Sequence, residues 1–162
     1  LPAILALNWS YYERENLWIV VTTSKTPAAY FRGLMMSLMA IGLVVAGAFL
    51  LFSMGTGRVS MPVSEVALPI AAAVGSALVA TALLTRLKVQ PSAFSLSMLA
   101  ILFLVVVAGY LGGFAAQGVV LAAEAALGLG ALLQASVLVA YCAVLSAVGL
   151  WWVSRLAAGF RL

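Results

Sequence analysis

Residues 33–52 read GLMMSLMAIGLVVAGAFLLF, a run without a single charged side chain. An α-helix rises about 1.5 Å per residue, so this stretch is long enough to cross the roughly 30 Å hydrocarbon core of a bilayer. Further uncharged stretches of this kind follow at residues 66–85, 92–114 and 130–154. Backbone inside a bilayer must satisfy its own hydrogen bonds, so each stretch predicts a helix. We therefore predict an all-α, polytopic transmembrane helical bundle with four spanning helices.

The composition of the whole chain also indicates a lipid environment. Of its 162 residues, 66% are hydrophobic and 7% are charged, whereas soluble domains are about 45–50% apolar and about 25% charged. The mean hydropathy is +1.23. A soluble fold of this size could not bury so much apolar surface, so the expected surroundings are the lipid bilayer. The eight Lys and Arg residues are scattered between the apolar stretches, which argues against nucleic acid as a partner.

Several kinds of chemistry lack the residues that they need. The chain contains no histidine and a single cysteine, Cys142. This excludes His-ligated metal or haem and Ser–His or Cys–His catalysis within the chain. The glycines never fall in the GxxxxGK[ST] order of a phosphate-binding loop. We expect no enzyme activity, no metal site and no cofactor, and any ATP that drives this protein must bind another polypeptide.

The distribution of basic residues predicts the orientation of the chain. With four spans, the segment before residue 33, the connection near residues 86–91 and the tail after residue 154 share one side of the membrane. Arg58 is the single basic residue of the opposite side. The shared side carries seven basic residues: Arg14, Lys25, Arg32, Arg86, Lys88, Arg155 and Arg161. The tryptophans lie near the same side: Trp9, Trp18, Trp151 and Trp152. Both patterns predict a multi-pass protein of the cell membrane with both ends in the cytoplasm.

Two segments do not fit a spanning helix. Residues 114–129 are apolar and rich in small residues, contain Gly118 and Gly128, and are too short to cross the bilayer and return. We predict that they form a short re-entrant or interfacial element on the outer side.

Residues 1–32 alternate between apolar and polar stretches. We predict that they contain the end of an upstream helix and then a cytoplasmic amphipathic helix, and that the chain is part of a longer polypeptide.

The most informative motif is YYERENLWIVVTTSKTPAAYFRG at residues 11–33. An acidic–basic–acidic triplet is followed by the apolar patch 17–21, then by a turn rich in Thr, Ser and Pro, and then by Tyr30 and Gly33. This pattern resembles the signature of ABC exporter permeases of the second type (ABC-2-like membrane subunits), a family of six-helix transport subunits. The family pattern usually has Lys after the final Gly, where this chain has Leu34.

The resemblance implies a function and a set of partners. In that family the motif forms a cytoplasmic coupling helix between the second and third spans, and this helix docks on a separate ATP-binding subunit. The four spans of this chain correspond to the last four helices of such a permease, which would form a homodimer. The implied docking residues are Glu13, Arg14, Glu15, Leu17 and Trp18. The family also has a re-entrant element between its last two spans, in the position of residues 114–129.

A plainer interpretation of residues 11–33 remains open. Charged residues that reach the aqueous phase and an apolar patch that contacts the bilayer surface also describe an ordinary juxtamembrane amphipathic segment. The alternative function is therefore a non-catalytic structural or accessory membrane subunit of a larger respiratory or secretion complex.

Small residues within the spans predict sites of close helix packing. Gly109 and Gly113 form a GxxxG pair, and Ala71 and Gly75 form a second pair of small residues at the same spacing. Such pairs allow two helix backbones to approach closely, either within one chain or between two copies. Because the chain is rich in alanine throughout, we expect packing within the chain.

Three polar residues near the predicted outer side are candidates for function. Glu124 is an ionisable residue in an apolar segment, which makes it a functional candidate by default. The alternative is that it faces water at the tip of a loop, which we favour. Gln117 and Gln134 are expected to form hydrogen bonds between helices, worth about 0.6–2 kcal/mol in a bilayer.

Overall fold

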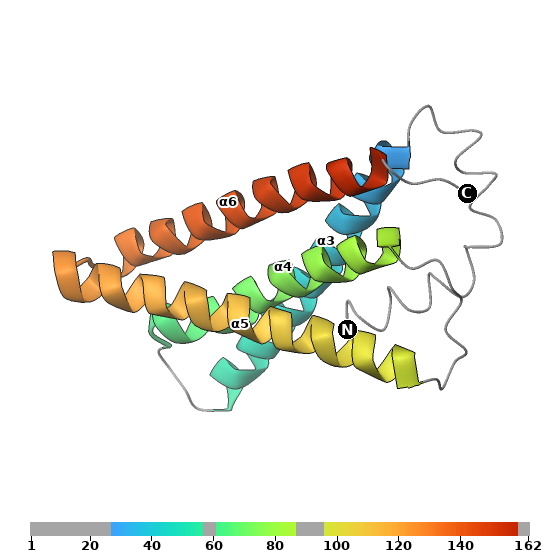
Figure 1. The fold of residues 1–162 in the computed structure, drawn as a ribbon. Helices are drawn as coiled ribbons and strands as arrows, with labels where there is room; N and C mark the ends of the chain where they lie inside the picture. Colours follow the sequence, from blue (N-terminus) through green and yellow to red (C-terminus); the bar gives the residue numbers. More distant parts are fainter. Residues whose placement is uncertain (1–26, 57–60, 87–95, 159–162) are drawn as a thin grey trace.

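The computed structural model describes residues 27–56, 61–86 and 96–158 of the chain. The described residues form four helices (Figure 1): α3 (Pro27–Gly55), α4 (Val63–Arg86), α5 (Leu96–Leu127) and α6 (Ala131–Ala158). All four are long and apolar enough to cross a membrane. This confirms the prediction of an all-helical chain with four helices of spanning length. α3 and α4 extend beyond both ends of the uncharged stretches that predicted them, and α5 and α6 extend beyond the C-terminal ends. Residues 27–32 form the first turns of α3.

The prediction of a re-entrant element at residues 114–129 is wrong. α5 continues without interruption to Leu127, because the Ala-rich sequence after Phe114 has a high helix propensity and one glycine does not outweigh it. The helix ends at Gly128, whose φ of 59° is costly for any residue with a side chain. The Gly128 N–H donates to the Glu124 carbonyl oxygen at 2.8 Å, which closes the helix with a left-handed cap. The extra residues lengthen the third span, and the number of spanning helices remains four.

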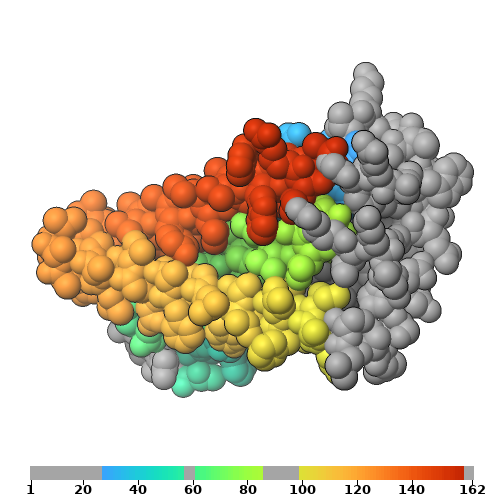
Figure 2. Space-filling model, viewed as in Figure 1, coloured from blue at the N-terminus to red at the C-terminus, as the bar shows by residue number. Residues whose placement is uncertain are grey.

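α4 is the central helix of the bundle. It contacts α3, α5 and α6, whereas no Cα atom of α3 lies within 8 Å of one in α5 among the described residues. Figure 2 shows α4 in the space between α5 and α6, which diverge from their shared turn. About half of the spanning part of α4 is buried, a larger share than in the other helices. α4 holds α3 and α5 apart, and the space between these two helices forms the groove described below.

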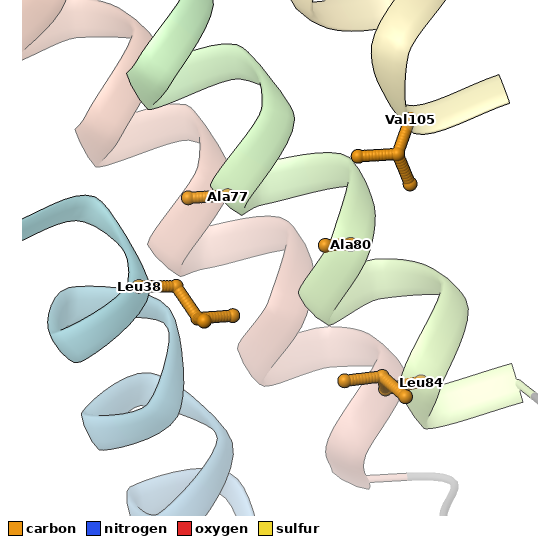
Figure 3. Packing of buried hydrophobic residues seen from close by; sticks show 5 residues of the cluster. All are labelled: Leu38, Ala77, Ala80, Leu84 and Val105. Atoms are coloured by element: carbon orange, nitrogen blue, oxygen red, sulfur yellow. The ribbon is translucent and has the colours of Figure 1, made fainter. Parts of the chain in front are cut away.

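Small side chains on α4 let its neighbours approach. In the cluster shown in Figure 3, Leu38 of α3 and Val105 of α5 pack against Ala77 and Ala80 from either side. Two further clusters lie along the same helix. The first joins α3, α4 and α6 through Phe31, Met35, Leu78, Val153 and Ala157. The second joins α4, α5 and α6 through Ala67, Ala71, Ala116, Val120 and Leu138.

The helices alternate in direction, so the start of α3 and the end of α6 lie at the same end of the bundle (Figure 1). The charged residues of the described helices are separated along this axis. Arg32, Arg86 and Arg155 belong to one end, which we call the basic end. Glu65 and Glu124 belong to the other, which we call the acidic end.

Aromatic residues mark the basic end as a membrane interface. Trp151 and Trp152 on the last turns of α6 are exposed. The Arg155 guanidinium carbon lies 5.4 Å from the centre of the Trp151 ring, a cation–π contact. Tryptophan paired with a basic residue at a helix end is typical of the boundary between lipid and water. These features and the four apolar helices describe a multi-pass, membrane-embedded protein.

Candidate functional site

Three of the four small residues predicted to pack closely lie on facing surfaces of α4 and α5. A Cβ atom added to Gly113 would lie 2.7 Å from the Leu68 carbonyl oxygen, and one added to Gly109 would lie 3.1 Å from the Ala72 carbonyl oxygen. A Cβ atom on Gly75 would lie 3.7 Å from the Ala108 carbonyl oxygen. The 2.7 Å distance at Gly113 leaves no room for a side chain, the 3.1 Å distance at Gly109 is tight, and the 3.7 Å distance at Gly75 is an ordinary van der Waals contact. The two helices are therefore joined along a nearly continuous line of backbone contacts.

Ala71, the fourth of these residues, is fully buried and belongs to the cluster that joins α4, α5 and α6. A Cβ atom added to Gly112 of α5 would lie 3.8 Å from the Ala71 carbonyl oxygen. Both predicted pairs of small residues are thus used in contacts within the chain.

Beside this line of contacts, the bundle has a groove between α3 and α5 with α4 as its floor. We call the half of this groove that lies at the middle of the helices the deep section. It has a volume of about 350 Å³, within the roughly 300–1,000 Å³ range of small-molecule sites. Ser76 and Tyr110 are the only polar side chains among its described lining residues. The other lining residues include Val45, Phe49 and Val106, each of which is more than a third exposed.

The second half of the groove, which we call the outer section, continues to the acidic end and has a volume of about 620 Å³. Four residues line both sections: Phe49, Pro69, Ala72 and Tyr110. The outer section adds the polar residues Ser53, Thr56, Glu65 and Gln117. The groove therefore changes from apolar at the level of the bilayer centre to polar near the end of the helices.

Three of the polar residues that line the outer section, Ser53, Thr56 and Glu65, present hydrogen-bond acceptors, whereas Gln117 and Tyr110 can both donate and accept. The Ser53 hydroxyl donates to the Phe49 carbonyl oxygen, and the Thr56 hydroxyl donates to the Ser53 carbonyl oxygen, both at 2.9 Å. A hydroxyl has one proton and two lone pairs, so each of these oxygens retains the capacity to accept. The Glu65 carboxylate is also an acceptor and carries negative charge. This combination suits a ligand group that donates hydrogen bonds.

The three polar residues singled out in the sequence have separate places. Gln117 is half-buried and lines the outer section. Gln134 is buried at the start of α6, where its Nε2 donates to the Leu129 carbonyl oxygen at 2.9 Å, so it stabilises the turn between α5 and α6. Glu124 is exposed in the last turn of α5 and does not line the groove.

Sequence reasoning did not assign the groove or most of its lining. Glu65 could have been noticed as the acidic residue that opens the second span, and Pro69 as a proline inside that span. Proline has no backbone N–H, so it interrupts the helical hydrogen bonds of a span and leaves a backbone carbonyl that other groups must satisfy. Neither residue by itself indicates that α3 and α5 stand apart.

Other candidate sites are not supported or lie elsewhere. The predicted docking residues, which are numbered 13–18, lie outside the described residues. In the described ranges, no group of His, Cys, Asp and Glu could hold a metal ion. Cys142 is half-buried in the middle of α6. Its neighbour Tyr141 links α6 to α5, because the Tyr141 hydroxyl donates to the Gly112 carbonyl oxygen at 3.2 Å.

Comparison of the chain with protein families, with curated protein sequences and with solved structures finds no match in any of the three.

Proposed function

We propose that this chain is the membrane-embedded permease part of an ATP-driven exporter and works with a separate ATP-binding subunit. The observation that carries the proposal is the position of the motif at residues 11–33. α3 begins at Pro27, inside this motif, so the motif is joined directly to the basic end of the bundle. A segment that transmits force from a soluble subunit must be joined to the spanning helices, and this motif runs into α3.

The distribution of charge supports the same arrangement. The described basic residues lie at the end of the bundle from which the motif emerges. The positive-inside rule orients this end toward the cytoplasm, where ATP is hydrolysed. In this orientation the acidic end faces outward, and the groove between α3 and α5 extends from the bilayer centre toward it. A substrate held in the groove would leave from the outer section.

The continuous helix α5 favours a second candidate function. The family resemblance implied a re-entrant element between the last two spans, and α5 and α6 are instead joined by the short turn at residues 128–130. A four-helix bundle without this element also fits a structural or accessory subunit of a larger membrane complex. The two functions differ in the partner that binds residues 11–33: an ATPase in one case, other membrane subunits in the other.

Co-purification of partners with the chain from its native membrane tests the proposal. We expect an ATPase subunit to co-purify with the wild-type chain and to be lost when Glu13 and Glu15 are both replaced by Lys. Glu124→Lys is the matched control, because Glu124 is an exposed acid at the opposite end of the bundle, and it should retain the ATPase. If no ATPase co-purifies with the wild-type chain and residues 11–21 cross-link to other membrane subunits, the exporter proposal fails and the accessory function replaces it.

A further inference from the structure

We propose that the groove between α3 and α5 binds cationic amphiphiles, with the aliphatic chain in the deep section and the ammonium head in the outer section. As the assignment of a transported substrate, this inference rests on the exporter proposal. As the assignment of a binding site, it stands on the groove alone.

The deep section has the character of a site for a hydrocarbon chain. Gly42 and Ala46 of α3 and Ala72 and Ala73 of α4 contribute small side chains to its wall and floor, and these leave room between the helices. The polar side chain at its floor is engaged within its own helix, because the Ser76 hydroxyl donates to the Ala73 carbonyl oxygen at 3.1 Å. Apart from the Tyr110 hydroxyl, a polar ligand group would find few partners there to replace its hydrogen bonds to water, whereas an aliphatic chain has no such bonds to lose.

The outer section selects the head group. Its described polar lining includes the Glu65 carboxylate and the Ser53 and Thr56 hydroxyls, whose protons are already donated to backbone carbonyls. An ionised carboxylate has about four lone-pair sites, so it can accept from a ligand in addition to a partner within the chain. An alkylammonium head offers three N–H donors and a positive charge, which this set of acceptors matches. An anionic head would meet the carboxylate with repulsion.

The two sections also lie at the depths that an amphiphile requires. Glu65 is in the first turn of α4 and Thr56 directly follows the end of α3. Both positions belong to the ends of spanning helices, where the bilayer changes from hydrocarbon to head groups. Val45 and Val105 lie near the middle of α3 and in the membrane-spanning part of α5. A ligand in the proposed orientation therefore keeps its chain in hydrocarbon and its charge at the interface.

Equilibrium binding of radiolabelled dodecylammonium to the purified chain in phosphatidylcholine nanodiscs tests this site, with empty nanodiscs as the reference for partition into lipid. We expect saturable binding that weakens by about tenfold or more in Glu65→Gln, because a hydrogen bond to a charged group is lost. Glu124→Gln removes the same charge from the same end of the bundle outside the groove and should bind as the wild type does. Glu65→Asp should retain binding. Dodecyl sulfate should not compete.

A second variant addresses the deep section. Val45→Trp adds bulk at a position that lines the groove and is 43% exposed, so the indole should occupy the groove without disturbing the core. It should weaken binding while circular dichroism and elution volume stay unchanged.

Equal binding by wild type and Glu65→Gln, equal losses in Glu65→Gln and Glu124→Gln, or competition by dodecyl sulfate would overturn the assignment. The binding assay contains no ATPase. A negative result in this assay therefore leaves the exporter proposal intact, and failure of an ATPase to co-purify leaves the binding-site proposal intact.

Discussion

Gly113 of α5 lies so close to Leu68 of α4 that a Cβ atom added to the glycine would be 2.7 Å from the Leu68 carbonyl oxygen. The group that it would meet is backbone and cannot move aside as a flexible side chain does. The close approach of α4 and α5 therefore depends on the absence of a side chain at this position.

Gly113→Ala should destabilise the bundle by about 1–3 kcal/mol, the usual cost of forcing extra volume into a packed contact. Gly118→Ala is the matched control on the same helix, because a Cβ atom there meets nothing within 4 Å. It should be neutral or stabilising by up to about 1 kcal/mol through its higher helix propensity. Unfolding of both variants by SDS in mixed micelles, followed by circular dichroism, measures the difference. Equal stability of the two variants would contradict the packing described here.

Gly128→Ala should weaken the turn between α5 and α6. The φ of 59° at Gly128 places the residue in the left-handed region, where a side chain costs about 1–2 kcal/mol. Gly130→Ala is the control, because it is in the same turn, has open space around it and does not have a positive φ. The same SDS titration should show a loss for the first variant and little change for the second. A turn that tolerates both substitutions equally would argue for a different α5–α6 connection.

Gln134→Ala should loosen the first turn of α6. It removes the donor that holds the Leu129 carbonyl oxygen, at a cost of about 0.5–1.5 kcal/mol for a typical hydrogen bond. Amide hydrogen exchange reports this locally: the Leu133 amide, which donates to the Gly130 carbonyl oxygen at 3.0 Å, should exchange faster. Ser136→Ala removes an exposed hydroxyl that bonds within α6 and should leave that exchange rate unchanged. Unaltered exchange in Gln134→Ala would mean that the side chain does not stabilise the turn.

Hydropathy predicted the four spanning helices because an uncharged run of about 20 residues has few alternatives to a helix in lipid. The same reasoning failed at residues 114–129, where Gly118 and Glu124 suggested a break. Neither residue interrupts α5, in which alanine is the most frequent residue after Phe114. The glycine that does end α5 is distinguished by its backbone conformation. The φ angle of a glycine cannot be read from the sequence, so Gly118 and Gly128 could be distinguished only in the structure.

The groove could not be predicted from the sequence for a different reason. Its lining comes from three helices, and it exists because α3 and α5 both pack against α4 while their backbones stay apart. Gln117 was noticed as a polar residue within an apolar segment, but its relation to Glu65 and Ser53 appears only when the helices are placed in space. The small residues at positions 109 and 113 indicated close packing, and the structure identifies α4 as the partner helix.

The central claim is that the helices cross the membrane four times with the basic end in the cytoplasm, the side on which the proposed ATPase subunit would dock. Single cysteines at Arg32, Thr56, Leu127 and Arg155, in a Cys142→Ser background, test it with a membrane-impermeant maleimide applied to intact cells and to inverted vesicles. We expect Thr56→Cys and Leu127→Cys to label in intact cells and Arg32→Cys and Arg155→Cys to label only in inverted vesicles. Labelling of Leu127→Cys and Arg155→Cys from the same face, or of Arg32→Cys in intact cells, would contradict the four-span topology or its orientation.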